Sequence, residues 1–128
     1  MLDSPLLQPD EYVPLAAELR VRSFPESFAY YTQKLGFTPV RTDPPHKFAC
    51  LRLGETLLMI LEDPLQGPKG QGIFLRMAVP HLDAYYQQCL ARGAKTLGPP
   101  ERRYWGARRF YVEDPDGFRI QVIPAQPE

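Results

Sequence analysis

The sequence predicts an α+β fold in which two βαβββ modules form a curved mixed sheet with a cup-shaped face. Two strands of the same alternating design, 15–21 and 73–79, are each followed by an amphipathic helix. Three further strands are expected after each helix, and the Pro- and Gly-rich residues 63–72 separate the two copies. Each helix covers only one face of its sheet, so two modules placed edge to edge can curve their bare faces into a cup.

The length and the proline positions indicate one ordered domain. A chain of 128 residues can bury a single core. The 15 prolines fall at element borders, which indicates rigid loops. We expect an extended arm over residues 1–14, modules at 15–62 and 73–123 joined by the linker 63–72, and a tail over residues 124–128.

Start and stop signals define both helices. Ser23 and Glu26 have the spacing of a capping box, with Pro25 in the first turn, and Gly36 ends the first helix. The second helix follows Pro80 and stops at the next glycine, Gly93. The helices also share residue types at an offset of 55, with Tyr30-Tyr31 matching Tyr85-Tyr86 and Leu35 matching Leu90. This match indicates either equivalent positions or a chance similarity between two amphipathic helices.

The remaining strands follow from alternation between turn residues. They are expected at 38–41, 47–53 and 56–61 in the first module, and at 95–97, 108–113 and 118–123 in the second. A tight turn joins the last two: Pro115 pre-sets φ, Asp114 and Asp116 can bond their own backbone, and Gly117 accepts a positive φ.

Charge and hydropathy exclude two classes of partner. Lys plus Arg and Asp plus Glu both number 15, which disfavours nucleic-acid binding because such domains carry a basic excess. No apolar run approaches ~18 residues and no signal-peptide pattern follows Met1, so we expect a cytoplasmic protein that binds no membrane. Cys50 and Cys89 look like small buried hydrophobic residues rather than a disulfide.

The segment before and within the last hairpin carries a family resemblance. Trp105-Gly106-x-Arg108, followed by Asp114-Pro-Asp-Gly, resembles the glyoxalase/bleomycin-resistance/dioxygenase (vicinal oxygen chelate) superfamily, over about residues 15–123. The resemblance implies the paired-module fold. It also implies a homodimer in which the cups are completed between chains.

The same resemblance implies where a divalent metal would bind in metal-dependent relatives. The four ligand positions fall on Ala16, Met59, Phe74 and Gln121. Alanine, methionine and phenylalanine are not ligands for hard ions, and one amide oxygen is too few. We therefore expect no metal and no other cofactor, and the sequence argues against the metal-dependent chemistries of the superfamily.

The predicted cup carries both polar and apolar candidates for ligand binding. By alternation, Glu18 and Arg76 point away from the helix-covered core. They either meet a polar ligand or form a structural pair across the module junction. The full candidate set is Glu18, Phe48, Met59, Phe74, Arg76, Trp105, Arg108, Tyr111 and Gln121.

The loop before the penultimate strand allows two readings. Trp105 is the only tryptophan, and it either anchors the loop in the core or offers a stacking plane at the rim of the cup. Arg108 matches the arginine of the family's Trp-Gly-x-Arg and either fixes this loop, which we favour, or contacts an anion.

These observations favour a metal-independent protein of the bleomycin-resistance type that binds a small aromatic or apolar, antibiotic-like molecule. Bleomycin-type drugs are cationic and the proteins that sequester them tend to be acidic. This chain has no net charge and a basic loop around Trp105, which favours a neutral or anionic aromatic ligand. The alternatives are a lyase-, isomerase- or dioxygenase-type enzyme that recruits a metal or uses Glu18 as a base, and a non-binding module whose cup is filled by its own side chains.

Overall fold

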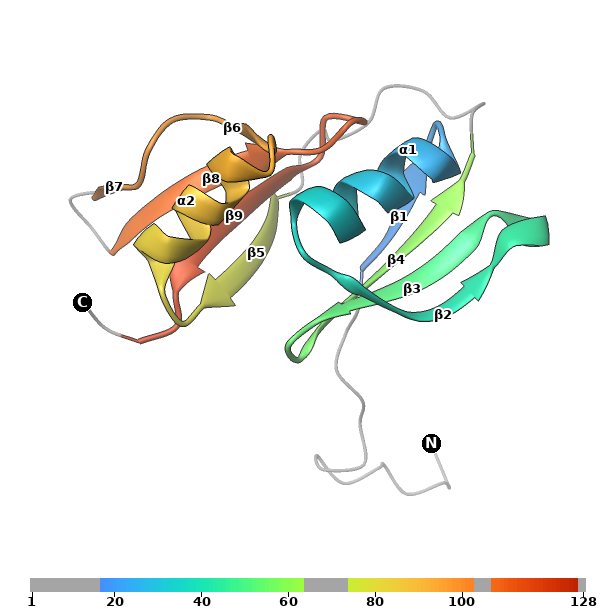
Figure 1. The fold of residues 1–128 in the computed structure, drawn as a ribbon, viewed down its shortest axis with the longest axis horizontal. Helices are drawn as coiled ribbons and strands as arrows, with labels where there is room; N and C mark the ends of the chain where they lie inside the picture. Colours follow the sequence, from blue (N-terminus) through green and yellow to red (C-terminus); the bar gives the residue numbers. More distant parts are fainter. Residues whose placement is uncertain (1–16, 64–73, 103–106, 127–128) are drawn as a thin grey trace, which may run out of the picture.

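A computed structural model describes residues 17–63, 74–102 and 107–126 (Figure 1). The expected N-terminal arm, nearly all of the expected linker, and Trp105 lie outside these ranges. In the described ranges, no helix has the length and apolar character needed to cross a membrane.

The first module has the predicted βαβββ connectivity. It begins with β1 (Ala17–Val21), α1 (Phe24–Ala29) and a π-helical turn, η2 (Tyr30–Lys34). It continues with β2 (Thr38–Asp43), the 3₁₀ turn η3 (Pro44–His46), β3 (Phe48–Leu53) and β4 (Thr56–Glu62). The strand order is β1-β4-β3-β2; β1 is parallel to β4 and the other pairs are antiparallel.

The second module repeats this arrangement with one addition. It contains β5 (Phe74–Val79), α2 (Leu82–Ala91), β6 (Lys95–Thr96), β8 (Arg108–Glu113) and β9 (Arg119–Pro124), in the sheet order β5-β9-β8-β6. The added strand, β7 (Glu101–Arg102), pairs with β8 and was not expected from the sequence, because two residues are too short to show alternation.

The α+β class and the paired modules are confirmed, but the strands form two sheets rather than one continuous sheet. Figure 1 shows the sheets next to each other with both helices on the same side. No described strand of one sheet pairs with a described strand of the other. Consequently β1 and β5 are edge strands, each paired within the described ranges on one side only.

The core lies between each helix and its sheet, as the alternation predicts. Leu19 and Val21 of β1 are buried, whereas Glu18 and Arg20 are exposed on the other face. Buried Ile120 and Val122 have the same role in β9. The face of each sheet opposite its helix, here called the open face, is therefore the one available to a ligand.

The helix signals read from the sequence are confirmed. The Ser23 hydroxyl accepts a hydrogen bond from the backbone N–H of Glu26 at 3.3 Å, which satisfies one of the unpaired donors at the start of α1. Gly36 and Gly93 follow the helices with φ of 91° and 78°, the left-handed conformation that ends helices at little cost for glycine.

The equivalence at an offset of 55 is wrong. The carbonyls of Val21 and Val79, 58 positions apart, both accept from the residue that follows the last strand of their module. The glycines that end the helices, Gly36 and Gly93, are only 57 apart, because η2 accommodates one extra residue in the first module. Leu35 and Leu90 are accordingly not equivalent: Leu35 is buried, whereas Leu90 is 44% exposed.

The turn between β8 and β9 joins the two modules. Asp114 accepts hydrogen bonds from the backbone N–H groups of Asp116 and Phe118, as expected for such a turn. Its other carboxylate oxygen accepts from the Tyr31 hydroxyl of the first module at 2.8 Å. Asp116 accepts from both the backbone N–H and the Nε of Arg22, at 3.0 and 2.9 Å.

Burial of these carboxylates shifts their chemistry. Asp114 is 4% exposed and Asp116 is 8% exposed. Desolvation raises the pKa of Asp114 from 3.8 to about 6, against the opposing effect of its hydrogen bonds from Tyr31 and the backbone. The folded protein therefore holds this proton more tightly than the unfolded chain does.

We expect Asp114→Asn to remove a pH dependence of stability. In the native protein, the stabilisation linked to Asp114 protonation is fully present below about pH 3.8 and is lost as pH rises through about 6. Relative to the variant, the free energy of unfolding of the native protein should therefore fall by up to about 3 kcal/mol between pH 4 and 7. Urea denaturation at several pH values measures it. The exposed control Glu55→Gln should show no such trend, and a flat difference for Asp114→Asn would contradict the assignment.

Candidate functional site

The open face of the first module has an apolar centre. Cross-strand pairing places Met59 of β4 between Cys50 of β3 and Glu18 of β1. Phe48 is paired with Leu61 in the next row, and the Arg41 guanidinium lies 5.5 Å from the centre of the Phe48 ring. All of these apolar side chains are half-buried although no helix covers them, so the face can still bury area against a ligand.

The open face of the second module is polar. Gln121 of β9 is paired with Arg76 of β5 on one side and Tyr111 of β8 on the other. The Gln121 Nε2 donates a hydrogen bond to the Tyr111 hydroxyl at 2.9 Å, which fixes the amide. In the next row, Lys95 and Arg119 both pair with Glu113 and hold the pKa of that carboxyl below its usual range, Lys95 having the larger effect.

Met59 and Gln121 occupy equivalent positions in the two modules. The family resemblance implies that metal-dependent relatives have metal ligands at these positions. Met59 is the register partner of Glu18, and Gln121 is the register partner of the corresponding residue Arg76. A thioether does not suit a hard divalent ion, and Gln121 offers only one neutral amide oxygen. Phe74 has no donor atom, and Ala16 lies outside the described residues. These side chains do not fit a divalent metal.

Within residues 17–63, 74–102 and 107–126, no cluster of three or more His, Cys, Asp or Glu side chains is placed to hold a metal ion. The imidazole of His46 lies 2.8 Å from the carboxylate of Asp43 at the exposed turn η3, away from the open faces' central rows.

The postulated structural pair between Glu18 and Arg76 does not form. Glu18 instead accepts from Arg20 on its own strand, at 3.1 Å. Arg76 forms no hydrogen bond or ion pair with any residue in the described part of the chain. The reason is geometric: β1 and β5 belong to separate sheets and are not register partners.

Arg108 does not belong to the open face. It has the same alternation as the buried residues Phe110 and Val112, so it faces the side covered by α2. Its two terminal nitrogens donate to both carboxylate oxygens of Asp83 in the first turn of α2, at 2.9 and 2.8 Å, which lowers the pKa of Asp83. Of the two readings of Arg108, the structure favours a fixing role, here on α2.

Two other candidates cannot be placed by the structure. Trp105 lies outside the described residues, so both readings of this tryptophan stay open. Phe74 is the first residue of β5 and the register partner of Arg119, but its side chain is not among those described.

Alternation and register together extend the candidate set. Cys50 and Leu61 share the open face with Phe48 and Met59, and sequence reasoning did not select them. The signal was available, because Cys50 is two residues from Phe48 and Leu61 is two residues from Met59. Both cysteines are free, as expected, although Cys50 is only half-buried.

A groove of about 1190 Å³ separates the two modules and reaches Arg76. One wall comes from the β3–β4 turn around Gly54 and Glu55, and the other from β5 and the α2 side chains that include Tyr85. The Tyr85 hydroxyl donates to the carbonyl of Leu35 at 2.8 Å, so it bridges the modules at the groove. Arg76 is therefore accessible both from the open face and from the groove.

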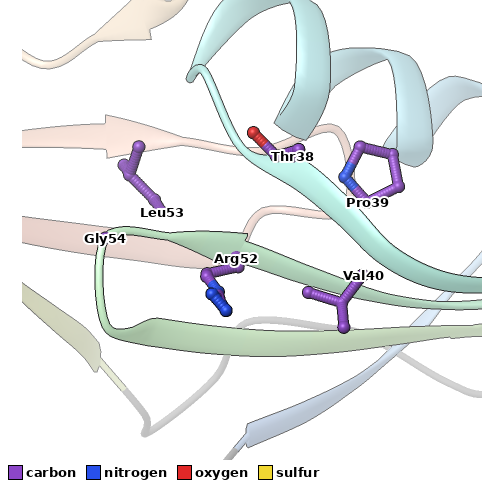
Figure 2. A pocket seen from close by; sticks show the side chains of 6 residues that line it. All are labelled: Thr38, Pro39, Val40, Arg52, Leu53 and Gly54. Carbon is purple, nitrogen blue, oxygen red and sulfur yellow. The ribbon is translucent and has the colours of Figure 1, made fainter.

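A second, smaller pocket of about 430 Å³ lies on the other side of the same turn. Figure 2 shows its lining residues, which come from β2, from the end of β3 and from the turn that follows: Thr38, Pro39, Val40, Arg52, Leu53 and Gly54. Val40 is 56% exposed there. This pocket is open, and none of the candidate residues from the sequence lines it.

The fold, the open faces and the chain's sequence agree on the class of protein. The sequence matches the family model of the Glyoxalase/Bleomycin resistance protein/Dioxygenase superfamily over residues 13–122. The chain belongs to this superfamily. No match was found among curated proteins.

Solved structures share the fold. A bleomycin-binding protein complexed with bleomycin is 24% identical with a TM-score of 0.73, over 90% of this chain and 100% of that chain. A bleomycin resistance determinant encoded on the transposon Tn5 is 24% identical with a TM-score of 0.75, over 88% and 98%. TioX from Micromonospora sp. ML1 is 18% identical with a TM-score of 0.73, over 90% and 100%.

Proposed function

We propose that this protein is a metal-independent binding protein for a small aromatic or apolar molecule of antibiotic-like character. The observation that carries the proposal is the open face of the first module, where Phe48, Met59 and Leu61 are half-buried without a covering helix. Contiguous apolar surface of this kind commonly marks a ligand or protein site. Two proteins of the same fold, a bleomycin-binding protein and a bleomycin resistance determinant, support an antibiotic-like ligand.

Energetics require more than one apolar face. Burying ~200 Å² of an aromatic ligand contributes about 5 kcal/mol. Association itself costs an estimated ~4–15 kcal/mol, so one face alone would bind weakly. A second surface and a charged contact are needed, and the open face of the second module offers both through Tyr111, Gln121 and Arg76.

Completion of the site by a second chain fits these needs. We propose a homodimer in which the open face of one chain's first module faces the second module of its partner. The open edges of β1 and β5 support this arrangement, because such edges are usually covered in native proteins.

An enzymatic role for Glu18 has less support. Glu18 is held by Arg20 in an exposed ion pair, and among residues 17–63, 74–102 and 107–126 no second candidate for proton transfer pairs with it. We therefore place Glu18 at the border of the binding face and assign it no catalytic step.

We expect Met59→Asp to weaken binding of the neutral probe N-phenyl-1-naphthylamine by about tenfold or more. A carboxylate in the middle of the apolar row must be desolvated by a bound aromatic ring. Fluorescence titration measures the dissociation constant. The matched control Val40→Asp, at a 56% exposed position outside the row, should change it by less than about twofold. Equal effects of both substitutions, or no binding of the probe by native protein, would contradict the proposal.

Metal independence predicts that the purified protein binds the same probe equally well before and after dialysis against EDTA. The side chains at the family's ligand positions lack the donors that a divalent ion needs. Elemental analysis should find less than stoichiometric Ni, Zn, Mn and Fe. A stoichiometric metal whose removal weakens probe binding would refute this part of the proposal.

The dimer predicts a mass of twice the 14.7 kDa of one chain in sedimentation equilibrium. A charge placed on an open edge should weaken it, and Ala78→Asp on β5 is a suitable substitution because this side chain is exposed in one chain. A native protein that sediments as a monomer at ~100 µM would exclude the two-chain site.

A further inference from the structure

We infer that Arg76 and Gln121 form a subsite for an oxyanion substituent, such as a carboxylate, sulfonate or phosphate, on the aromatic ligand. The inference rests on the proposed binding function and specifies the ligand's charge. It assigns the apolar open face of the first module to the ring and the polar open face of the second module to the anion.

The Arg76 guanidinium and the Gln121 amide lie next to each other on the sheet. Arg76 and Gln121 are register partners on adjacent parallel strands and point to the same open face. The guanidinium offers several N–H donors in a planar fork that matches two oxygens of an anion. One N–H of the Gln121 amide is donated to the Tyr111 hydroxyl, and the second N–H of this amide forms no hydrogen bond within the described ranges.

Arg76 also differs from Arg119, the other exposed arginine on the open face of the second module. Arg119 pairs with Glu113, whereas Arg109 of β8 is partly buried and donates to the carbonyl of Ala107. Arg41 and Arg52 lack an acidic partner among the described residues as well, but they belong to the first sheet and do not adjoin Gln121. Arg76 has no acidic partner in the described part of the chain, so its charge is available to a ligand.

The Arg76 side chain is accessible to a ligand. Arg76 is exposed and lines the groove of about 1190 Å³ between the modules, so a substituent can reach it without rearrangement of the sheet. Among the residues that the structure describes, Glu55 is the one acidic residue lining this groove. It lies on the opposite wall and forms no ion pair with Arg76. The protein as a whole has no net charge, so the preference for an anion arises locally.

The test compares two probes that differ only by an anion. We expect native protein to bind 8-anilinonaphthalene-1-sulfonate about tenfold more tightly than the neutral N-phenyl-1-naphthylamine, as measured by fluorescence titration at low salt. Arg76→Gln should remove this preference by weakening the sulfonate about tenfold while changing the neutral probe by less than about twofold. Raising the salt concentration should weaken only the sulfonate.

Two further variants separate a local contact from a general charge effect. Arg52→Gln makes the same charge change on the first module and should leave both affinities within about twofold. Gln121→Glu places a carboxylate beside Arg76 and should weaken the sulfonate about tenfold. Thermal unfolding and retained binding of the neutral probe show that each variant is folded.

The outcomes distinguish this inference from the proposed function. Binding of the neutral probe without a preference for the sulfonate overturns the anion subsite and leaves the proposed function standing. An equal loss of sulfonate binding in Arg52→Gln and Arg76→Gln also overturns the subsite. Failure of native protein to bind either probe overturns both.

Discussion

The two carboxylates of the β8–β9 turn hold the modules in one arrangement. Asp114 and Asp116 receive hydrogen bonds from Tyr31, Arg22 and their own turn, and both are nearly inaccessible to water. Within the described ranges, no strand of one sheet pairs with a strand of the other, so side-chain contacts connect the modules. Two further hydrogen bonds contribute: the Tyr30 hydroxyl donates to the carbonyl of Glu113, and the Tyr85 hydroxyl donates to the carbonyl of Leu35. A buried charge is costly unless it is satisfied, which makes this junction specific. The relative position of the two open faces depends on it.

Much of the fold follows from local patterns in the sequence. The capping residues Ser23 and Glu26, the helix-ending Gly36 and Gly93, and the alternation in β1 and β9 all have short-range physical causes that a single sequence displays. The separation into two sheets was not foreseen, because pairing between β1 and β5 depends on contacts distant in sequence. The turn carboxylates were read only as turn formers; their bonds to Tyr31 and Arg22 span more than 80 residues.

The sequence predicts the candidate site well where strand alternation decides the face and poorly where contacts distant in sequence decide it. Met59, Phe48, Tyr111 and Gln121 lie on the open faces because a strand's period of two decides the face. Arg108 lies on the helix-covered face with Phe110, and its partner Asp83 could not be foreseen because it is on a helix 25 residues away in the sequence. The pair of Glu18 and Arg76 failed because equivalent positions in two modules need not be neighbours.

The π-helical turn has a consequence for the internal symmetry of the chain. It gives the first helix one residue that the second helix lacks, and it presents Tyr30 and Tyr31 to the other half of the molecule. The hydroxyl groups of Tyr30 and Tyr31 donate to the carbonyl of Glu113 and the carboxylate of Asp114, whereas Tyr85 of the second half donates in return only to the backbone carbonyl of Leu35. The two halves are therefore not interchangeable. A tandem of two identical second halves would retain each sheet and helix but would lose the tyrosine that offsets part of the desolvation of Asp114.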